Sequence, residues 1–532
     1  MFQPMKQTAP SRASASNVIA INGREAVKIK AAGSAIACVL ILVCVVGLAV
    51  YVVEGLSLFR LGEAGYGDSY ILYDVLHFQQ TDTIYRDLSR PPYLPAQYSP
   101  LVYVLYSLPG RIAHSKNPFV GPRLIVITAF LMCIGIATSI VHTLIPSRLV
   151  WLWGMLIPFS TRSMSNWILQ IRGEFPGIAL SLLAIRLLVS DVRWALPLAG
   201  VCAGFAMQFK LTFIAAAVAG ALWLLAQKRW KDFVRFGVPA GLCSVGPYLL
   251  YSLREPRMLS QMFALSPGVR NITGNLDLMD KAIGELVILL ALLGLASIQW
   301  RTWPKETLVV LFAAISFAVA GLTDMQAGGN INYYFELFFA VVPIAVLGVF
   351  QLMELARRSA VLGLALTSLL VIHSVAPASL QLRTTIGALR NDWIQSGNAE
   401  LERFEHALAG HRIFSTIPRL ALFDPDPPLM EPYLLTYLHR LGKVDLGPVV
   451  EPIRRNGYDV VITDAWAGSF RGVKHVDPTL HQAIATSYRP HCKFRVWLFH
   501  LPNDVQPPGN ALAQELRNIG CSAVVANAET NW

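Results

Sequence analysis

The segment AAGSAIACVLILVCVVGLAVYVV, Ala31–Val53, carries no charged side chain over its whole length. An α-helix needs about 20 apolar residues to cross ~30 Å of hydrocarbon, and this segment is long enough. The preceding residues 1–30 are polar and basic, which favours a cytoplasmic N-terminus. The segment is too long for the core of a cleaved signal peptide and lacks a clear cleavage site. We therefore expect an uncleaved signal-anchor that follows a disordered cytoplasmic tail.

The same apolar character continues along the chain. Of 532 residues, 54% are hydrophobic and 14% are charged, which is far too apolar for a soluble protein of this length. Apolar runs occupy residues 34–53, 98–113, 121–144, 147–162, 174–190, 194–209, 211–227, 236–253, 283–299, 306–322, 332–352 and 359–378. The composition predicts a polytopic α-helical membrane protein. The net charge of +11 suits cytoplasmic loops that face anionic lipid, and no patch of mixed basic and aromatic residues indicates a nucleic-acid partner.

The distribution of Lys and Arg orients these segments. The most basic short loop, QKRWKDFVR at Gln227–Arg235, is expected in the cytoplasm together with residues 1–30. An odd number of crossings must then join the external loop 54–97 to Gln227–Arg235, but six apolar runs lie between them. The run 98–113 is short and is broken by a Pro-Gly pair, so we assign it as a re-entrant or interfacial segment. Eleven crossings result, with the N-terminus inside and the C-terminus outside.

The chain changes character after the last apolar run. Stretches rich in β-branched and aromatic residues are typical of strands, and they are RIFST (Arg412–Thr416), YDVVITDA (Tyr458–Ala465) and KFRVWLFHL (Lys493–Leu501). Amphipathic stretches lie among them, so residues 380–505 are expected to form a small extracytoplasmic α/β domain. Residues 506–532 are expected to be a loosely ordered tail. Cys492 and Cys521 could pair if this region is exported, or remain free thiols.

The loop after the first apolar segment holds an acidic group in aromatic surroundings. GYGDSYILYD (Gly65–Asp74) places Asp68 among tyrosines, just outside the expected bilayer. In a half-dry cleft a carboxylate has a raised pKa and can accept a proton from a hydroxyl group. Asp68 could instead be a helix cap or a solvated loop carboxylate. The Pro- and Tyr-rich stretch Pro91–Tyr103 that follows is either a substrate groove or an interfacial aromatic belt.

Several stretches share an order and a spacing with a known family. They are Asp68 followed by IYRD and YSPLVY, then QIRGEFPGIALSLLAIRLL (Gln170–Leu188), AGFAMQFKLTFIAAAVAGALWLL (Ala203–Leu225) and GGNINYYFEL (Gly328–Leu337). Together they resemble the GT-C glycosyltransferases, with the bacterial family-39-like, RgtA/B/C/D-like membrane enzymes as the nearest group. The resemblance spans most of residues 34–465. It implies a GT-C-like transmembrane domain at residues 31–379 with a large first external loop at 54–97.

The resemblance implies an inverting transferase that moves a sugar from a polyprenyl-phosphate donor to an acceptor hydroxyl at the outer face of the membrane. Asp68 matches the acidic residue taken as catalytic in the family. Where the family often has Asp-Glu, this chain has Asp68-Ser69, so no cofactor is certain and a divalent metal stays open. The family's Arg-x-Asp is here Arg172-Gly173-Glu174, and Tyr98 stands where related loops often carry Lys before Pro-Pro-Leu.

A lipid-linked phosphosugar has an anionic leaving group, which cations stabilise most strongly in a low dielectric. We expect Arg172 and Lys210 to bind the donor phosphate. Alternatively, Arg172 pairs with Glu174 or snorkels, and Lys210 snorkels at a helical hairpin. The expected substrate-binding residues are Glu174, Tyr98, Asn330, Asn332, Tyr333, Tyr334 and Glu336. The asparagines and tyrosines could instead form a Gly-rich turn with an aromatic belt, and Glu336 could be a helix N-terminal carboxylate or a partner for a cation.

The expected partners are a polyprenyl-phosphate-linked sugar, membrane lipid, and an acceptor that is a glycolipid, a polysaccharide or a protein. The expected location is a bacterial inner membrane. A transporter or flippase for a lipid-linked sugar is an alternative that would use the same basic outer cavity. It needs a polar path through the bilayer, and the apolar runs offer few charges for one. A non-catalytic membrane scaffold, with Asp68 incidental, is a third possibility.

Overall fold

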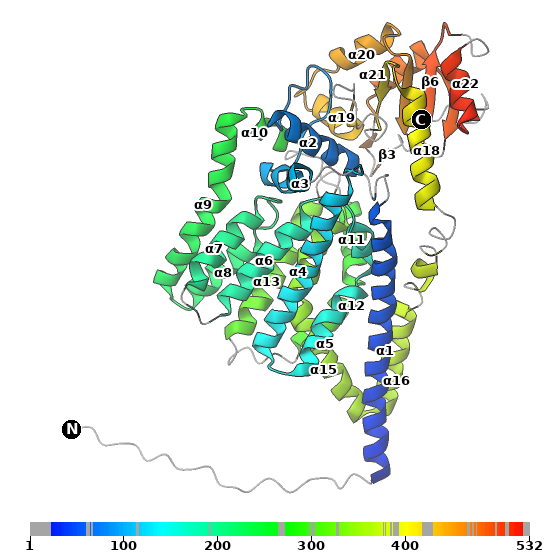
Figure 1. Ribbon diagram of the computed structural model, residues 1–532. Helices are drawn as coiled ribbons and strands as arrows, with labels where there is room; N and C mark the ends of the chain where they lie inside the picture. The colour runs from blue at the N-terminus through cyan, green and yellow to red at the C-terminus, as the bar shows by residue number, and fades with distance from the viewer. Residues whose placement is uncertain are drawn as a thin grey trace.

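Apolar helices build most of the molecule, and a smaller α/β unit lies at one end of them, as the computed structural model shows (Figure 1). The structure describes residues 23–59, 64, 67–112, 116–190, 192, 194–263, 272–296, 298, 304–325, 329–375, 377, 379–383, 386, 393–417, 429–464, 469–470, 473–474, 476–494, 497–505 and 510–524. Residues 1–22 of the expected cytoplasmic tail lie outside this range. Helix α1 (Gly23–Gly55) includes the rest of that tail and the first apolar segment.

The helices of the bundle follow the apolar runs of the sequence, because each run can bury side chains against its neighbours in one continuous apolar core. After α1 they are α4 (Val120–Leu144), α5 (Arg148–Leu156), α6 (Glu174–Leu188), α7 (Ala195–Ala206), α8 (Ala215–Ala226), α9 (Trp230–Arg254), α12 (Leu286–Leu295), α13 (Pro304–Asp324), α14 (Phe335–Ala340), α15 (Val342–Arg358) and α16 (Ala360–Leu370). Shorter elements connect or extend them: the 3-10 helices η1 (Leu56–Phe59), η2 (Ile157–Ser160), η3 (Arg162–Trp167) and η4 (Ile331–Tyr334), the π-helical turn η5 (Val371–Val375), α10 (Met258–Met262) and α11 (Ile272–Ile283).

Four helices among the described residues are long and apolar enough to cross a membrane, which makes the chain an integral membrane protein. They are Gly33–Phe59, Val120–Leu144, Trp230–Arg254 and Lys305–Asp324. A fifth span results if Ile331–Ala340 and Val342–Arg358, which are bent by 63°, act as one. The remaining apolar helices are shorter, at Arg148–Ser160, Ala195–Ala206, Ala215–Ala226 and Leu286–Leu295. The expected eleven crossings therefore stay a prediction.

Glycines allow a close contact between α12 and α15. A Cβ atom built on Gly294 of α12 would overlap the carbonyl oxygen of Ile344, and one on Gly348 of α15 would overlap that of Leu290. The two backbones therefore touch where each helix has a glycine. Without a hydrophobic force between helices in lipid, such close van der Waals packing is a main source of helix association.

Two helices between α1 and α4 pack on each other, α2 (Asp68–Thr81) in the expected first external loop 54–97 and α3 (Pro100–Ile112) after it. Both lie at the end of the bundle that carries the α/β unit (Figure 1). The carboxylate of Glu255, which follows α9, accepts the backbone N–H groups of Ile84 and Tyr85 at 2.9 and 2.7 Å. This buried carboxylate fixes the chain that follows α2, since its loss would leave two buried donors unpaired.

The C-terminal unit is an α/β domain with a five-stranded sheet of order β1-β2-β6-β5-β7. Its strands are β1 (Ile413–Ser415), β2 (Val460–Asp464), β5 (Tyr488–Phe494), β6 (Trp497–Pro502) and β7 (Ser522–Ala523), with a separate pair β3 (Ser469–Phe470) and β4 (Val473–Lys474). Its helices are α18 (Trp393–Leu408), α19 (Pro432–Arg440), α20 (Gly447–Arg454), α21 (Pro478–Ser487) and α22 (Ala511–Asn518). β1 and β2 are parallel and the other pairs are antiparallel.

Two expectations for this domain need correction. The stretch Lys493–Leu501, expected as one strand, contains the end of β5 and most of β6, which pair antiparallel with Phe494 opposite Trp497. The expected loose tail, residues 506–532, contributes α22 to the core and β7 to the sheet. Leu512, Ala513 and Leu516 of α22 are buried because their i, i+1, i+4 spacing forms one apolar face. Residues 506–509 and 525–532 of that tail lie outside the described residues.

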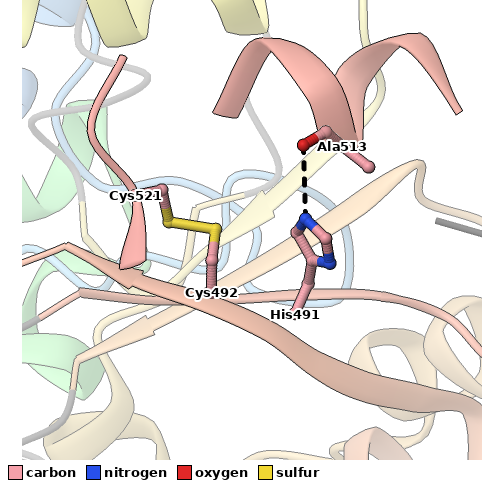
Figure 2. Close-up of a disulfide and its surroundings, with 4 residues drawn as sticks. All are labelled: His491, Cys492, Ala513 and Cys521. Carbon is pink, nitrogen blue, oxygen red and sulfur yellow. Dashed lines mark hydrogen bonds between the residues drawn. A yellow bond between two sulfur atoms is a disulfide. The ribbon is translucent and has the colours of Figure 1, made fainter. Parts of the chain in front are cut away.

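A disulfide joins Cys492 of β5 to Cys521, which directly precedes β7 (Figure 2). Beside it, the ring of His491 is hydrogen-bonded to the carbonyl oxygen of Ala513 in α22 at 3.3 Å. The other five cysteines are free thiols. Disulfides persist in oxidising compartments, so this bond supports export of the domain.

The domain is joined to the first external loop by backbone and side-chain contacts. Tyr93 donates its backbone N–H to Leu429 at 2.6 Å and its hydroxyl to the carbonyl oxygen of Pro448 at 2.7 Å. The hydroxyl of Tyr70, on α2, donates to the carbonyl oxygen of Thr416 at 2.5 Å. The loop that carries Asp68 is thus held between the bundle and the C-terminal domain.

Thiol counting tests the disulfide. After denaturation without reductant, a maleimide polymer should add to five cysteines per chain, and after reduction it should add to all seven. The measurement is the mass shift on a gel. In the Cys492→Ser/Cys521→Ser variant the count should be five under both conditions. Seven additions to the wild-type chain without reductant would contradict the disulfide.

Candidate active site

Asp68 begins α2 and lies fully buried at the junction of three segments. The preceding Gly67 has a φ of 92°, a left-handed backbone conformation that glycine adopts without a Cβ penalty. One carboxylate oxygen of Asp68 accepts the backbone N–H of Ile171 at 3.1 Å, and the other accepts that of Ala64 at 3.0 Å. The carboxylate therefore connects the first external loop to the segment before α6.

Burial and nearby cations act on Asp68 in opposite directions. Removal from water raises the pKa of its carboxyl group, while Arg123, Arg172 and the two backbone hydrogen bonds lower it. Burial prevails, and the pKa is raised to about 6. The group is then largely ionised at neutral pH, yet its affinity for a proton is higher than that of an ordinary aspartate. Such a carboxylate suits a general base.

Arg172 lies next to Asp68 and orients toward the loop. A Cβ atom built on Gly67 would lie 3.4 Å from Nη2 of Arg172, so the guanidinium approaches the start of α2. Nη1 of Arg172 is 3.4 Å from the hydroxyl oxygen of Tyr98, and the guanidinium carbon is 5.0 Å from the centre of the Trp167 ring. The hydroxyl of Tyr106 donates to the backbone carbonyl of Arg172. Tyr98 and Arg172, both expected at the site from sequence, are therefore in contact.

A second charged group lies two residues further, around Glu174. Its carboxylate oxygen Oε1 is 3.3 Å from Nζ of Lys210 and accepts Nδ2 of Asn332 at 2.6 Å. The Nζ atom of Lys210 also lies 3.8 Å from the centre of the Tyr333 ring. The other oxygen, Oε2, is buried with no hydrogen-bond partner among the described residues. The structure thus brings together four residues that come from three separate stretches of the sequence.

Gly173 keeps the two charged groups adjacent. A Cβ atom at this position would lie 2.8 Å from the backbone oxygen of Phe209, so the chain before α6 presses against the chain before Lys210. Because Arg172 and Glu174 flank this glycine, one cation and one carboxylate are presented at the same contact. The break between α7 and α8 places Lys210 there, which explains why two helices of this region are short.

The remaining predicted residues hold the structure around this group. Asn330 caps η4, its side chain accepting the backbone N–H of Ile331 at 2.8 Å. Tyr334 is buried. Glu336 lies in the first turn of α14, and its Oε2 is 3.3 Å from the hydroxyl oxygen of Ser316. Glu174 forms its ion pair with Lys210, whereas the sequence alternative paired it with Arg172.

Sequence reasoning missed Arg123, which is fully buried on α4 and acts electrostatically on Asp68. Its Nη1 donates to the carbonyl oxygen of Leu58 at 3.2 Å, and its guanidinium carbon lies 4.6 Å from the centre of the Phe119 ring. A signal for it exists: it is an arginine inside an apolar run, and ionisable groups at such positions usually face a functional interior. Two cations, rather than one, therefore face the candidate base.

The surroundings of Asp68 do not fit a divalent metal. Such ions take several oxygen ligands, often from more than one carboxylate. Both oxygens of Asp68 already accept backbone N–H groups, and two arginines act on it. Across the described part of the chain, no group of three His, Cys, Asp or Glu side chains could hold a metal ion.

No family model and no curated protein sequence matches the chain. Solved structures do match. ArnT from Cupriavidus metallidurans in the apo state is 14% identical, with a TM-score of 0.57, and the match covers 84% of this chain and 95% of that one. ArnT from the same organism bound to undecaprenyl phosphate is 14% identical, with a TM-score of 0.59, covering 86% of this chain and 97% of that one.

A weaker match is the Archaeoglobus fulgidus oligosaccharyltransferase in its apo form, 10% identical with a TM-score of 0.49, covering 88% of this chain and 74% of that one. The two ArnT matches extend over the helical bundle and beyond it, since they cover more than four fifths of the chain. They agree with the resemblance that the sequence stretches indicate. The chain has the fold of the GT-C membrane glycosyltransferases.

Proposed function

We propose that this protein transfers a sugar from a polyprenyl-phosphate donor to an acceptor hydroxyl group at the outer face of the membrane. One observation carries the proposal. A buried carboxylate suited to be a base, Asp68, and two cations, Arg172 and Lys210, belong to one contiguous network at the same end of the helical bundle. The fold supports it, since a GT-C structure of matching architecture is bound to undecaprenyl phosphate.

In this mechanism Asp68 is the general base. Its carboxylate accepts the proton of the acceptor hydroxyl while the hydroxyl oxygen attacks the anomeric carbon of the donor sugar. The bond between that carbon and the phosphate oxygen breaks, and polyprenyl phosphate leaves with the bonding electron pair. Attack from the face opposite the leaving group inverts the anomeric carbon. The raised pKa of Asp68 serves this step, because a base works best when its pKa is near the working pH.

The departing phosphate gains negative charge, which Arg172 and Lys210 stabilise. Both lie in surroundings with little water, where the attraction between opposite charges is stronger than in bulk solvent. The Lys210 side chain is 15% exposed, so its ammonium group can be reached, whereas its partner Glu174 is 3% exposed. Glu174 and Asn332 hold Lys210 in place before the donor binds, so little of its freedom is lost on binding.

In this proposal the acceptor binds on the side of the site that lies next to the C-terminal domain. It contacts α2 through Tyr70 and the following loop through Tyr93, both within the segment that carries Asp68. An acceptor that reaches Asp68 from outside the bundle would pass between the loop and the domain. The proposed acceptor is a glycolipid, a polysaccharide or a protein.

The positions of the helix ends support the proposed outer-face placement. α1 begins at the end of the bundle opposite to α2, α3 and the C-terminal domain (Figure 1). If the basic N-terminal region stays in the cytoplasm, Asp68 and the C-terminal domain lie on the other side. The disulfide between Cys492 and Cys521 supports the same orientation.

Removal of the base tests the chemistry. Asp68→Asn should lower the transfer rate by about 10²- to 10⁴-fold, the usual contribution of a positioned general base. The assay uses purified protein with radiolabelled polyprenyl-phosphate sugars and a membrane extract as acceptor source. The wild-type rate should fall about tenfold for each pH unit below 6, because the protonated carboxyl group cannot accept a proton.

The matched control is Asp82→Asn, which changes an exposed carboxylate at the other end of α2. Its φ of 54° is tolerated by asparagine, so the fold should be kept and activity should equal that of wild type. Transfer by Asp68→Asn at the wild-type rate would refute Asp68 as the base. Uptake of the labelled lipid without any transfer would instead favour the flippase alternative.

Variants of the Lys210–Glu174 pair distinguish an effect on donor binding from an effect on stability. Lys210→Met leaves Glu174 buried and unpaired, which should cost about 3–5 kcal/mol of stability. Lys210→Met/Glu174→Gln should restore the melting temperature but keep the KM for the donor raised about tenfold, since one charged contact to the phosphate is lost. Lys281→Met, which breaks an exposed pair on α11, is the control. If the double variant had the wild-type KM for the donor, Lys210 would have no part in donor binding.

Cysteine labelling tests the orientation. In a background without the five free cysteines, Asn166→Cys and Gln227→Cys each add one exposed thiol. A membrane-impermeant maleimide added to intact cells should label the thiol at position 166, and it should label that at position 227 only after the membrane is permeabilised. The reverse pattern would place Asp68 on the cytoplasmic side and contradict the proposal.

A further inference from the structure

A cavity of about 610 Å³ lies beside α2, outside the group formed by Asp68, Arg172 and Lys210. Its volume is within the range of small-molecule sites. The lining side chains that could recognise a ligand are Tyr73, His77, Tyr85, Arg86, Arg90 and Arg257. They come from α2, from the loop that Glu255 fixes, and from the turn before α10.

Positive charge dominates this cavity. Three arginines line it, against one lining carboxylate, Asp87, which is 3.0 Å from Nη2 of Arg257. Arg86 forms an ion pair with the buried Asp74. Arg90 acts electrostatically on Asp87 but forms no close ion pair with any residue that the structure describes. The cavity is open to the outside at Arg257, whose side chain is 57% exposed.

Arg86 gives stronger evidence for a bound ligand than Arg90 does. Its side chain is only 9% exposed and interacts with Asp74 and with Tyr73, and by distance and angle its Nε and Nη1 atoms have no hydrogen-bond partner among the described residues. Buried donors are rarely left unpaired, because each costs free energy comparable to a lost hydrogen bond. A phosphate or carboxylate in the cavity would accept from a guanidinium group through more than one oxygen.

Aromatic rings give the cavity walls that suit a sugar. The guanidinium carbon of Arg86 lies 5.0 Å from the centre of the Tyr73 ring, which also stacks with His77 at 6.4 Å between ring centres. Tyr85 adds a further ring. Aromatic side chains beside convergent polar groups are common in small-ligand sites.

The cavity is close to the candidate base. Tyr73 lies five residues after Asp68 on the same helix, a rise of about 7.5 Å at 1.5 Å per residue. The hydroxyl of Tyr85 donates to the backbone oxygen of Tyr98 at 2.5 Å, and the Tyr98 hydroxyl contacts Arg172. A saccharide that places one unit in the cavity could therefore present a hydroxyl of a neighbouring unit toward Asp68.

We propose that this cavity binds an acidic sugar unit of the acceptor, one that carries a phosphate or a carboxylate group. That the sugar belongs to the acceptor rests on the proposed function, whereas the binding of an acidic sugar in the cavity does not. The acceptor of the transferase is then an anionic glycan. Arg86, Arg90 and Arg257 bind the charged group of its acidic sugar unit. The ring of that sugar lies against Tyr73 and Tyr85.

Binding to the purified full-length protein in detergent tests this directly. The probes are glucose 6-phosphate, glucuronate, glucose and inorganic phosphate, measured by saturation-transfer NMR. One or both acidic sugars should bind at least tenfold more tightly than glucose and than inorganic phosphate. Arg90→Gln and Arg257→Gln, both at the open side of the cavity, should each weaken that binding about tenfold, the effect of losing one charged hydrogen bond.

Arg111→Gln is the matched control, because Arg111 of α3 also forms an exposed ion pair, with Asp82, but lies outside the cavity. It should bind the probes as wild type does. Equal binding of glucose, equal binding of inorganic phosphate, or wild-type affinity in Arg90→Gln and Arg257→Gln would each overturn the proposal.

Asp68→Asn distinguishes this inference from the function on which it rests. Its affinity for the acidic sugar should equal that of wild type, because Asp68 does not line the cavity. If Asp68→Asn transferred sugar normally, the base would be wrong while the cavity result stood. If acidic sugars failed to bind but Asp68→Asn abolished transfer, the transferase would stand and the acidic acceptor would be wrong.

Discussion

The buried carboxylate of Glu174 is the group on which the site depends. A charge inside an apolar bundle is stable only when it is paired, and removal of one partner from such a pair costs about 3–5 kcal/mol. Lys210 and Asn332 meet this requirement from two other parts of the chain. Their convergence fixes the break between α7 and α8, the turn before α14 and the start of α6. The proposed donor site lies where these three breaks meet.

The same constraint gives Asp68 its chemistry. Burial favours its protonated form, while Arg123, Arg172 and two backbone N–H groups favour the carboxylate. The balance leaves a pKa of about 6, which a solvated loop carboxylate would not have. Arg172 acts on both acidic groups, because it contacts the start of α2 and lies two residues from Glu174. The base and the phosphate-binding cations in our proposal are therefore parts of one electrostatic network.

Much of this follows from the sequence, since apolar runs become helices wherever they can bury one another. Asp68, Arg172, Glu174 and Lys210 stood out because charged residues at the ends of such runs are costly. What the sequence could not show depends on long-range packing. The hairpin between β5 and β6 reads as one strand, because both halves share the same composition. The place of α22 depends on the burial of its apolar face in the core of the C-terminal domain, and the effect of Arg123 on Asp68 depends on how α4 lies beside the first loop.

The central claim is that Arg172 and Lys210 hold the donor phosphate within reach of Asp68. The most direct measurement is an electron cryo-microscopy map of the full-length protein with bound polyprenyl phosphate. We expect phosphate density within hydrogen-bond distance of Arg172 and of Nζ of Lys210, with space for one sugar ring between the phosphate and the carboxylate of Asp68. A phosphate bound at the opposite end of the bundle, or one that contacts neither cation, would contradict the account.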